Sequence, residues 1–221
     1  MNEKANISDI MLRTRTKEEL EIRKEEFLKI CQILDDLEIR YFLQTGILLG
    51  AIRHKGFIPW DWDIEISVFT NEIIYKTDTV ISKIKDSGFT IIKNYKEPTS
   101  YKIDFKGKLS EDTTYYTIWG WTHDIEKNFF WRDLDQIRKL KFPDHFVKNM
   151  QKIKLFDRYH LAPFPADKYL EYQYGDWKKI VKSIHQKDYL AKEFSGINTY
   201  TNFFKRIIKI IKKRLWMSKK Y

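Results

Sequence analysis

The chain has 221 residues, of which 43% are hydrophobic and 16% aromatic, a composition typical of folded globular proteins and not of disordered ones. This length accommodates one large domain or two small ones, with a sizeable core in either case. Cys31 is the only cysteine, which excludes an internal disulfide and a cysteine-rich zinc module.

The net charge of +10 is concentrated near the C-terminus. No acidic residue follows Glu193, and residues 205–220 carry eight Lys and Arg side chains, which leaves about +2 for the rest of the chain. The N-terminal segment lacks the apolar core of a signal peptide, and no run of about 18 apolar residues is present to span a bilayer. We therefore expect a cytoplasmic protein.

The first half of the chain predicts two helices and two strands after a polar, flexible N-terminus at residues 1–16. Apolar residues at three- and four-residue steps predict the helices, and alternation predicts the strands. The elements are expected at residues 17–39 (helix), 41–43 (strand), 47–53 (helix) and 60–68 (strand).

The second half predicts further strands and two helices, and no internal repeat or low-complexity linker interrupts it. The elements are expected at residues 71–87 (helix), 89–92, 101–105 and 115–122 (strands), and 168–174 (helix). Residues 129–159 give a mixed pattern that Pro143 interrupts. We therefore predict one domain over residues 17–195 that contains both helices and strands.

Three acids alternate along the strand predicted at residues 60–68. Asp61, Asp63 and Glu65 occupy positions i, i+2 and i+4, which share one face of a strand. Carboxylates placed this way repel one another unless a cation lies between them, and Mg²⁺ prefers such oxygen ligands while leaving positions for substrate phosphates. The alternative is a solvated strand that carries acids without a ligand.

A turn and a basic cluster precede these acids. The Thr45-Gly46 turn comes before a predicted helix, whose N-terminus would present backbone N–H groups to an anion. Arg53 at the end of this helix is either a phosphate-binding guanidinium or a solvated charge that complements the helix dipole. For His54 and Lys55 we favour the solvated interpretation.

A later aspartate is a candidate for the same site. Asp104 lies between Ile103 and Phe105 in the strand predicted at residues 101–105, so it points away from both. A carboxylate from a neighbouring strand would complete a metal site or act as a general base. The alternatives are a surface charge at Asp104 and a competing role for Asp124, which we rank second.

The segment GILLGAIRHKGFIPWDWDIEI, residues 46–66, closely resembles the signature of the LicD and fukutin family. The segments KIDF and YLEYQYGDWKK are similar to later parts of the same family, so the resemblance extends from about residue 24 to 180. The first motif is much more specific than the other two. In this chain Glu65 stands where many relatives have Asp, which lengthens the side chain but keeps the carboxylate.

The resemblance implies an α+β, nucleotidyltransferase-like fold, with a mixed β-sheet flanked by helices, and a phosphotransferase activity. Its reaction would transfer an alcohol phosphate, such as phosphocholine or a polyol phosphate, from a CDP-linked donor to a cell-surface glycan, with release of CMP. The implied ion is Mg²⁺, with Mn²⁺ as the alternative. The roles fall on two sets of residues: Asp63, Glu65 and Asp104 for catalysis and metal binding, and Thr45, Gly46, Arg53 and Asp61 for substrate binding.

Two other functions stay open as alternatives. A true nucleotidyltransferase would share the fold and the acids but leave a nucleotide on its product. A basic nucleic-acid-binding module would explain the net charge, but the basic residues are concentrated in the tail while the body keeps a compact group of acids. We therefore expect no nucleic-acid partner.

The tail, residues 196–221, predicts an amphipathic basic helix. Within residues 203–216 one helical face gathers Phe204, Ile207, Ile208, Ile211 and Leu215, and Lys and Arg occupy the rest. This pattern is typical of a helix that binds an anionic membrane surface. We therefore expect residues 201–221 to hold the protein at the inner face of the cell membrane, where a glycan acceptor would be lipid-linked. Alternatives are a helix that binds a partner protein, a nucleic acid or another copy of the chain.

Overall fold

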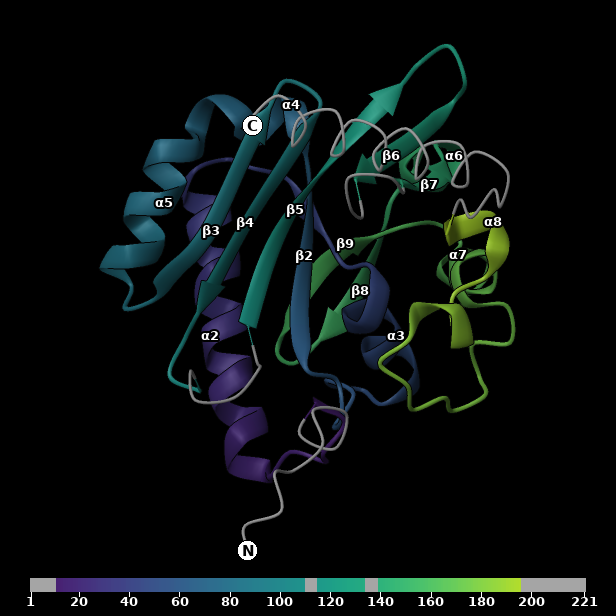
Figure 1. The fold of residues 1–221 in the computed structure, drawn as a ribbon, viewed down its shortest axis with the longest axis horizontal. Coiled ribbons are helices and arrows are strands. Elements are labelled where there is room, and N and C mark those ends of the chain that lie inside the picture. The colour runs from purple at the N-terminus through teal and green to yellow at the C-terminus, as the bar shows by residue number, and fades with distance from the viewer. Residues whose placement is uncertain (1–10, 110–114, 134–138, 196–221) are drawn as a thin grey trace, which may run out of the picture.

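The computed structural model describes residues 11–109, 115–133 and 139–195. Within them a mixed β-sheet forms the centre of the molecule (Figure 1), as the sequence predicts. Strand order is β3 (Thr90–Glu97), β4 (Ser100–Lys106), β5 (Tyr115–Asp124), β2 (Asp63–Phe69), β1 (Tyr41–Phe42), β9 (Arg158–Ala162) and β8 (Gln151–Leu155). Two pairs, β2 with β5 and β1 with β9, are parallel, and the others are antiparallel. A side branch, β6 (Phe129–Asp133) and β7 (Lys139–Pro143), continues from the end of β5.

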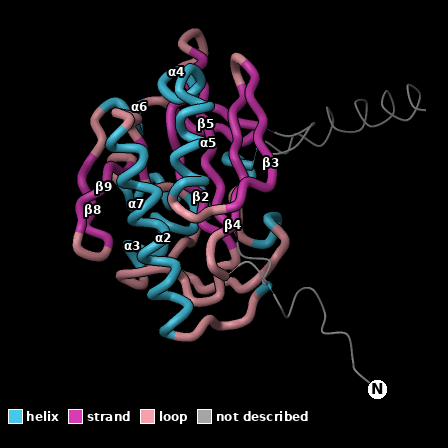
Figure 2. Tube along the Cα trace, turned by 90° about the vertical axis from the view of Figure 1, so that its left-hand side faces the viewer, coloured by secondary structure: helices cyan, strands magenta, loops and turns pink. Residues whose placement is uncertain are grey.

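Helices lie on both sides of this sheet, as expected (Figures 1 and 2). Helix α2 (Lys17–Asp36) and helix α5 (Thr77–Asp86) lie together behind strands β2–β5, and α4 (Thr70–Ile73) with a 3₁₀ turn, η1 (Ile74–Lys76), leads into α5. The remaining helical elements are α3 (Thr45–Arg53), α6 (His145–Lys148), α7 (Ala166–Tyr174), η2 (Gln186–Asp188) and α8 (Lys192–Ser195). None of the helices in the described ranges is long and apolar enough to cross a membrane.

Helix α2 confirms the predicted helix, although it ends at Asp36. A capping box starts it: Glu19 N–H donates to the Thr16 hydroxyl, and the Glu19 carboxylate accepts from Thr16 N–H. Phe27, Ile30 and Leu34, spaced three and four residues apart, are fully buried against the sheet. Their burial explains why this amphipathic segment is helical here.

Two predicted elements differ from the structure. The single helix expected at residues 71–87 is divided into α4, η1 and α5, and the Thr77 hydroxyl donates to the Ile74 carbonyl at the break. The strand expected at residues 60–68 begins only at Asp63, where its pairing with Tyr115 starts. Asp61 therefore lies before the strand, in a turn where its N–H donates to the Ile58 carbonyl.

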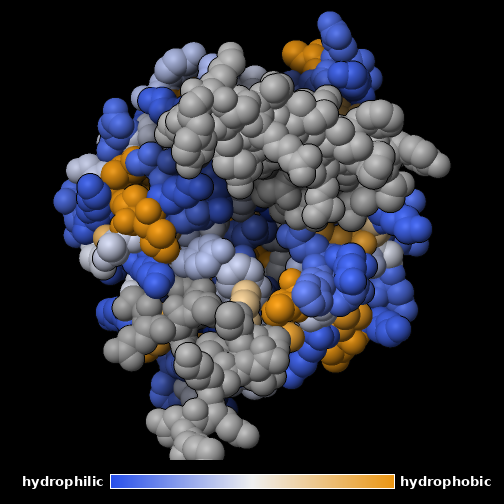
Figure 3. Space-filling view, viewed as in Figure 1, coloured by the Kyte–Doolittle hydropathy of each residue, from blue (hydrophilic) through white to orange (hydrophobic). Residues whose placement is uncertain are grey.

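Apolar and polar side chains alternate along the central strands, so one face of the sheet is apolar and the other is polar. Ile64, Ile103 and Ile118 are fully or almost fully buried on the face that α2 and α5 cover. Glu65, Thr117 and Asp104 are aligned neighbours on β2, β5 and β4, so they form a row on the opposite face. Figure 3 shows a hollow near the centre of its view, with hydrophilic side chains beside it.

Candidate functional site

A cavity of about 370 Å³ lies where the start of β2, helix α3 and the segment 173–194 meet. Six of the seven site residues predicted from the sequence line it. They are Thr45, Gly46, Arg53, Asp61, Asp63 and Glu65. The structure thus brings the turn, the guanidinium and the three acids of the first motif into one concave site.

Buried Arg23 of helix α2 holds the backbone that carries the first two acids. Its Nη1 donates to the Asp61 carbonyl at 2.6 Å and its Nη2 to the Asp63 carbonyl at 3.0 Å. Burial raises the pKa of Asp61 to about 6, although the charge of Arg23 opposes this shift. Burial and the neighbouring carboxylates of Glu65 and Asp61 raise the pKa of Asp63 well above its usual value.

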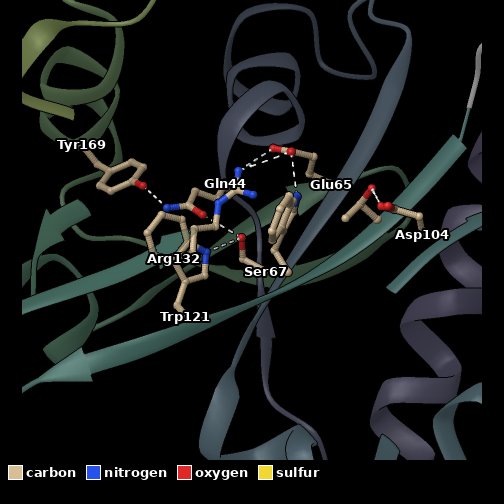
Figure 4. Close-up of polar contacts among 9 residues, drawn as sticks. Gln44, Glu65, Ser67, Asp104, Trp121, Arg132 and Tyr169 are labelled. Atoms are coloured by element: carbon tan, nitrogen blue, oxygen red, sulfur yellow. Dashed lines mark hydrogen bonds and ion pairs between the residues drawn. The ribbon is translucent and has the colours of Figure 1, made fainter. Parts of the chain in front are cut away.

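The third acid, Glu65, lies in a cage of polar and aromatic groups (Figure 4). Its Oε1 accepts from Trp119 Nε1 at 2.9 Å, and its Oε2 lies 3.1 Å from Nη2 of Arg132 in β6. Arg132 is only 3% exposed, and its guanidinium carbon lies 4.1 Å from the Trp119 ring centroid. Arg132 therefore supplies the positive charge nearest to Glu65 and fixes the orientation of its carboxylate.

Asp104 does not line this cavity. Thr117 separates it from Glu65 in the row across the sheet, and two strand spacings of about 4.8 Å place the backbones of β2 and β4 roughly 10 Å apart. The Asp104 carboxylate accepts from the Thr117 hydroxyl at 2.7 Å and lies 2.7 Å from Lys102 Nζ. In the part of the chain that the structure describes, no three His, Cys, Asp or Glu side chains are grouped closely enough to hold a metal ion.

Asp124, the competing candidate, lies at the far end of β5. Its carboxylate pairs with Lys127 Nζ at 2.9 Å, and it does not line the cavity. The geometry therefore gives Asp124 no part in the site described by the first motif.

The turn before α3 has an unusual backbone. Thr45 has a φ of +51°, a left-handed conformation that β-branched residues rarely adopt. At the next position a Cβ would lie 2.1 Å from Oδ2 of Asp61, so only glycine leaves room for this carboxylate. The Thr45-Gly46 turn and the Asp61 carboxylate are therefore in close contact at the N-terminal end of α3.

Arg53 links α3 to the wall of the cavity. Its Nη1 donates to the Trp177 carbonyl at 2.9 Å and to the Lys179 carbonyl at 3.3 Å. The guanidinium therefore holds a loop of the cavity wall, a contact that the sequence did not predict. Its predicted role as a phosphate contact stays a prediction.

Several residues that line the cavity or hold its acids in place have no counterpart among the residues predicted for the site. Arg132 comes from the segment whose pattern was mixed, and Arg23 looks like any basic residue of an amphipathic helix. Gln173, Tyr174 and Tyr189 come from α7 and the segment after it. The similarity of YLEYQYGDWKK to the family was the only sequence signal for this wall, and it assigned no roles.

A buried hydrogen-bond chain joins the elements beneath the site (Figure 4). Trp121 Nε1 donates to the Ser67 hydroxyl at 3.0 Å, and this hydroxyl donates to Gln44 Oε1 at 2.7 Å. The Gln44 amide donates in turn to the hydroxyl of Tyr169 on α7. This chain of hydrogen bonds connects β5, β2, the start of α3 and α7, so it holds two walls of the cavity together.

Comparison with known proteins supports the family resemblance found in the sequence. The family model described as "LicD/FKTN/FKRP, nucleotidyltransferase domain" matches residues 38–167. Human ribitol 5-phosphate transferase FKRP is 24% identical over 149 residues, which cover 65% of this chain but only 29% of that protein. An uncharacterised protein of Rickettsia typhi is 30% identical over 191 residues, covering 82% of this chain and 57% of that protein.

A short segment is much more similar to a bacterial relative. Lipopolysaccharide cholinephosphotransferase LicD of Haemophilus influenzae is 57% identical over 35 residues, 16% of this chain and 13% of that enzyme. The family resemblance predicted from the motifs is confirmed. The family model matches residues 38–167, which is more than half of this chain. The chain therefore belongs to the LicD/FKTN/FKRP family.

Proposed function

We propose that this protein transfers an alcohol phosphate from a CDP-linked donor to a cell-surface glycan and releases CMP. The observation that carries the proposal is the cavity that places Asp61, Asp63 and Glu65 beside the Thr45-Gly46 turn. Two relatives, a ribitol 5-phosphate transferase and a lipopolysaccharide cholinephosphotransferase, have names that describe the transfer of an alcohol phosphate. In the same proposal the domain over residues 17–195 has a nucleotidyltransferase-like fold.

Two carboxylates of the cavity are the proposed protein ligands of a divalent cation, whose other positions the donor phosphates would fill. Asp61 and Asp63 are half-buried carboxylates, and the raised pKa values of both are consistent with negative charges that lack full compensation. In our proposal Asp63 and Glu65 hold Mg²⁺, or Mn²⁺ as the alternative ion. When bound, the ion would neutralise phosphate charge and polarise the bond to the leaving group.

The remaining roles are proposed for the chain's own groups. The turn at Thr45 and Gly46, at the N-terminal end of α3, would orient a phosphate of the donor, and Arg53, at the other end of this helix, is the second proposed phosphate contact. Asp104 shares a face and a row with Glu65, which supports its proposed role as third carboxylate or general base. To take that role its carboxylate would have to leave Lys102.

The acids provide the direct test. Asp63→Asn and Glu65→Gln should each reduce CMP release from a panel of CDP-alcohols at least 100-fold, while circular dichroism shows a folded protein. Asp124→Asn, which changes an acid outside the cavity, is the matched control and should retain activity. Full activity of both cavity variants would refute the metal assignment. Release of pyrophosphate from a nucleoside triphosphate, without release of CMP from any CDP-alcohol, would establish a nucleotidyltransferase.

A further proposal concerns the tail. Residues 201–221 lie outside the described residues, so their predicted amphipathic helix and its binding to anionic lipid stay predictions from the sequence. The proposed location at the inner face of the membrane, near a lipid-linked acceptor, depends on this segment.

A further inference from the structure

The left-handed backbone of Thr45 is unusual for its place in the fold. Among the residues that the structure describes, five residues other than glycine have a positive φ. Four of them follow a helix or lie in a hairpin turn, where this conformation is common: Glu38, Lys55, Asn128 and Phe156. Thr45 is instead the first residue of a helix, and it alone of the five is β-branched. Such a conformation costs free energy and persists only where the surrounding structure enforces it.

The preceding residue, Gln44, is held at both ends of its side-chain amide (Figure 4). An indole can only donate, so the Ser67 hydroxyl accepts from Trp121 and donates its own hydrogen to Gln44 Oε1 at 2.7 Å. At the other end of the amide, Nε2 donates to the hydroxyl of Tyr169 on α7. None of these four residues is more than 2% exposed. Two different elements therefore fix the orientation of the Gln44 amide in the interior of the protein.

These hydrogen bonds connect the turn to the strand that carries the acids. Ser67 lies two residues after Glu65, so both side chains are on the same face of β2. Gln44 has an extended backbone, and the left-handed Thr45 after it turns the chain into α3, which brings Gly46 against the Asp61 carboxylate. Rotation of Thr45 to a negative φ would redirect the start of α3 and move the turn relative to the acids.

We infer that Gln44 is a positioning residue, whose buried amide holds Thr45 in the left-handed conformation and thereby places the Thr45-Gly46 turn against the acids. Its effect on catalysis rests on the proposed function, whereas the strain at Thr45 belongs to the protein without substrate. Gln44 does not line the cavity, although Thr45 and Gly46 do. It therefore acts on the site only through the backbone of the turn, where small displacements of a binding group cost catalytic rate.

The test is a double-mutant cycle on CMP release by the full chain with Mg²⁺, using whichever of CDP-glycerol, CDP-ribitol and CDP-choline reacts fastest. Gln44→Met keeps the length of the side chain but removes both hydrogen bonds, and it should lower kcat by about tenfold or more. Glycine adopts a positive φ without steric cost, so in a chain that already carries Thr45→Gly the same change should lower kcat less than about threefold. Equal losses in the two backgrounds would overturn the inference, because Gln44 would then not act through Thr45.

A milder variant keeps the test decisive if Gln44→Met does not fold. Tyr169→Phe retains the buried ring and removes only the hydroxyl that accepts from Gln44, and it should lower kcat by about threefold or more. Tyr172→Phe is the matched control, because it removes a hydroxyl on the same helix that donates to the Lys141 carbonyl at 3.3 Å, and it should keep kcat. Equal losses in both variants would mean that these hydroxyls serve only to dock α7, and would overturn the inference.

Thermal unfolding gives a second measurement that needs no turnover. Thr45→Gly relieves strain only where Gln44 imposes it, whereas the entropy that glycine adds to the unfolded chain is the same in both backgrounds. The change in melting temperature caused by Thr45→Gly should therefore be more favourable in the unmodified protein than in Gln44→Met or Tyr169→Phe. Equal changes would overturn the inference. Absence of CMP release from every donor by the unmodified protein would instead refute the proposed function, and the unfolding cycle would still decide the role of Gln44.

Discussion

At the scale of single residues, the site depends on how closely Gly46 and Asp61 approach each other. The Thr45-Gly46 turn was predicted from the sequence as an anion-binding helix start, but the carboxylate of Asp61 lies against it. Two glycines in the same region differ sharply in their surroundings. A Cβ at Gly50 would lie 2.5 Å from the Gly56 carbonyl oxygen, whereas a Cβ at Gly56 would meet nothing closer than 4.0 Å.

These distances predict that alanine substitutions at Gly46, Gly50 and Gly56 differ in their effects on activity and stability. Gly46→Ala should displace the Asp61 carboxylate and lower activity more than stability, because a side chain moves more easily than backbone. Gly50→Ala should lower the free energy of unfolding by about 1–3 kcal/mol, since the clash is with backbone. Gly56→Ala is the control and should change neither quantity. Urea unfolding and CMP release measure the series, and equal effects of all three substitutions would contradict it.

The raised pKa of Asp61 predicts how stability depends on pH. Because burial raises this pKa from 3.8 to about 6, the folded protein binds a proton that the unfolded chain has released over this range. Stability of the metal-free protein should therefore fall as the pH rises from about 4 to 6, through the contribution of this group. Asp61→Asn should reduce that slope in thermal unfolding curves, and an identical pH profile in the variant would rule out this assignment.

At the scale of elements, buried Arg23 of α2 fixes the entry into β2. Its guanidinium spans two carbonyl groups, at Asp61 and Asp63, and these contacts set the position of the acids relative to α3. The predicted helix 17–39 was correct, yet its pattern did not distinguish Arg23 from the exposed basic residues beside it. Only packing against the sheet buries Arg23, whereas Lys17 and Lys29 of the same helix are exposed.

Arg23→Met should lower the free energy of unfolding by about 3 kcal/mol or more, because two carbonyl groups in the interior lose a charged donor. Arg40→Met provides the matched control: Arg40 is paired with Glu72 at an exposed position, and such pairs contribute about 0–1 kcal/mol. Chemical denaturation of both variants makes the comparison, and similar losses would show that Arg23 acts only as a surface charge.

At the scale of the whole molecule, a nearly neutral body is combined with a strongly basic end. Eight basic side chains in residues 205–220 account for most of the net charge. Segments far apart in sequence build the cavity, with α3 and β2 on one side and residues 173–194 on the other. The body therefore supplies the proposed chemistry, and the tail is proposed to supply the location.

Removal of residues 201–221 should abolish binding to vesicles that contain anionic lipid, while CMP release from a water-soluble donor continues. The reason is electrostatic, so the binding of the full chain should weaken as salt is raised from about 0.05 to 0.5 M, because screening shortens the Debye length. Vesicle sedimentation measures both effects. Unchanged sedimentation of the truncated protein would contradict the membrane proposal.

The sequence by itself determined the first motif, the alternation of the central strands and the family, because these depend on local spacing. Thr45, Gly46, Arg53, Asp61, Asp63 and Glu65 could be predicted as neighbours since they lie within a short stretch of chain. Only the tertiary structure decided that Arg132 pairs with Glu65, that Gln173 lies in the same cavity, and that Thr117 separates Asp104 from Glu65. Strand order and register bring these residues together or keep them apart, and no local pattern encodes that order.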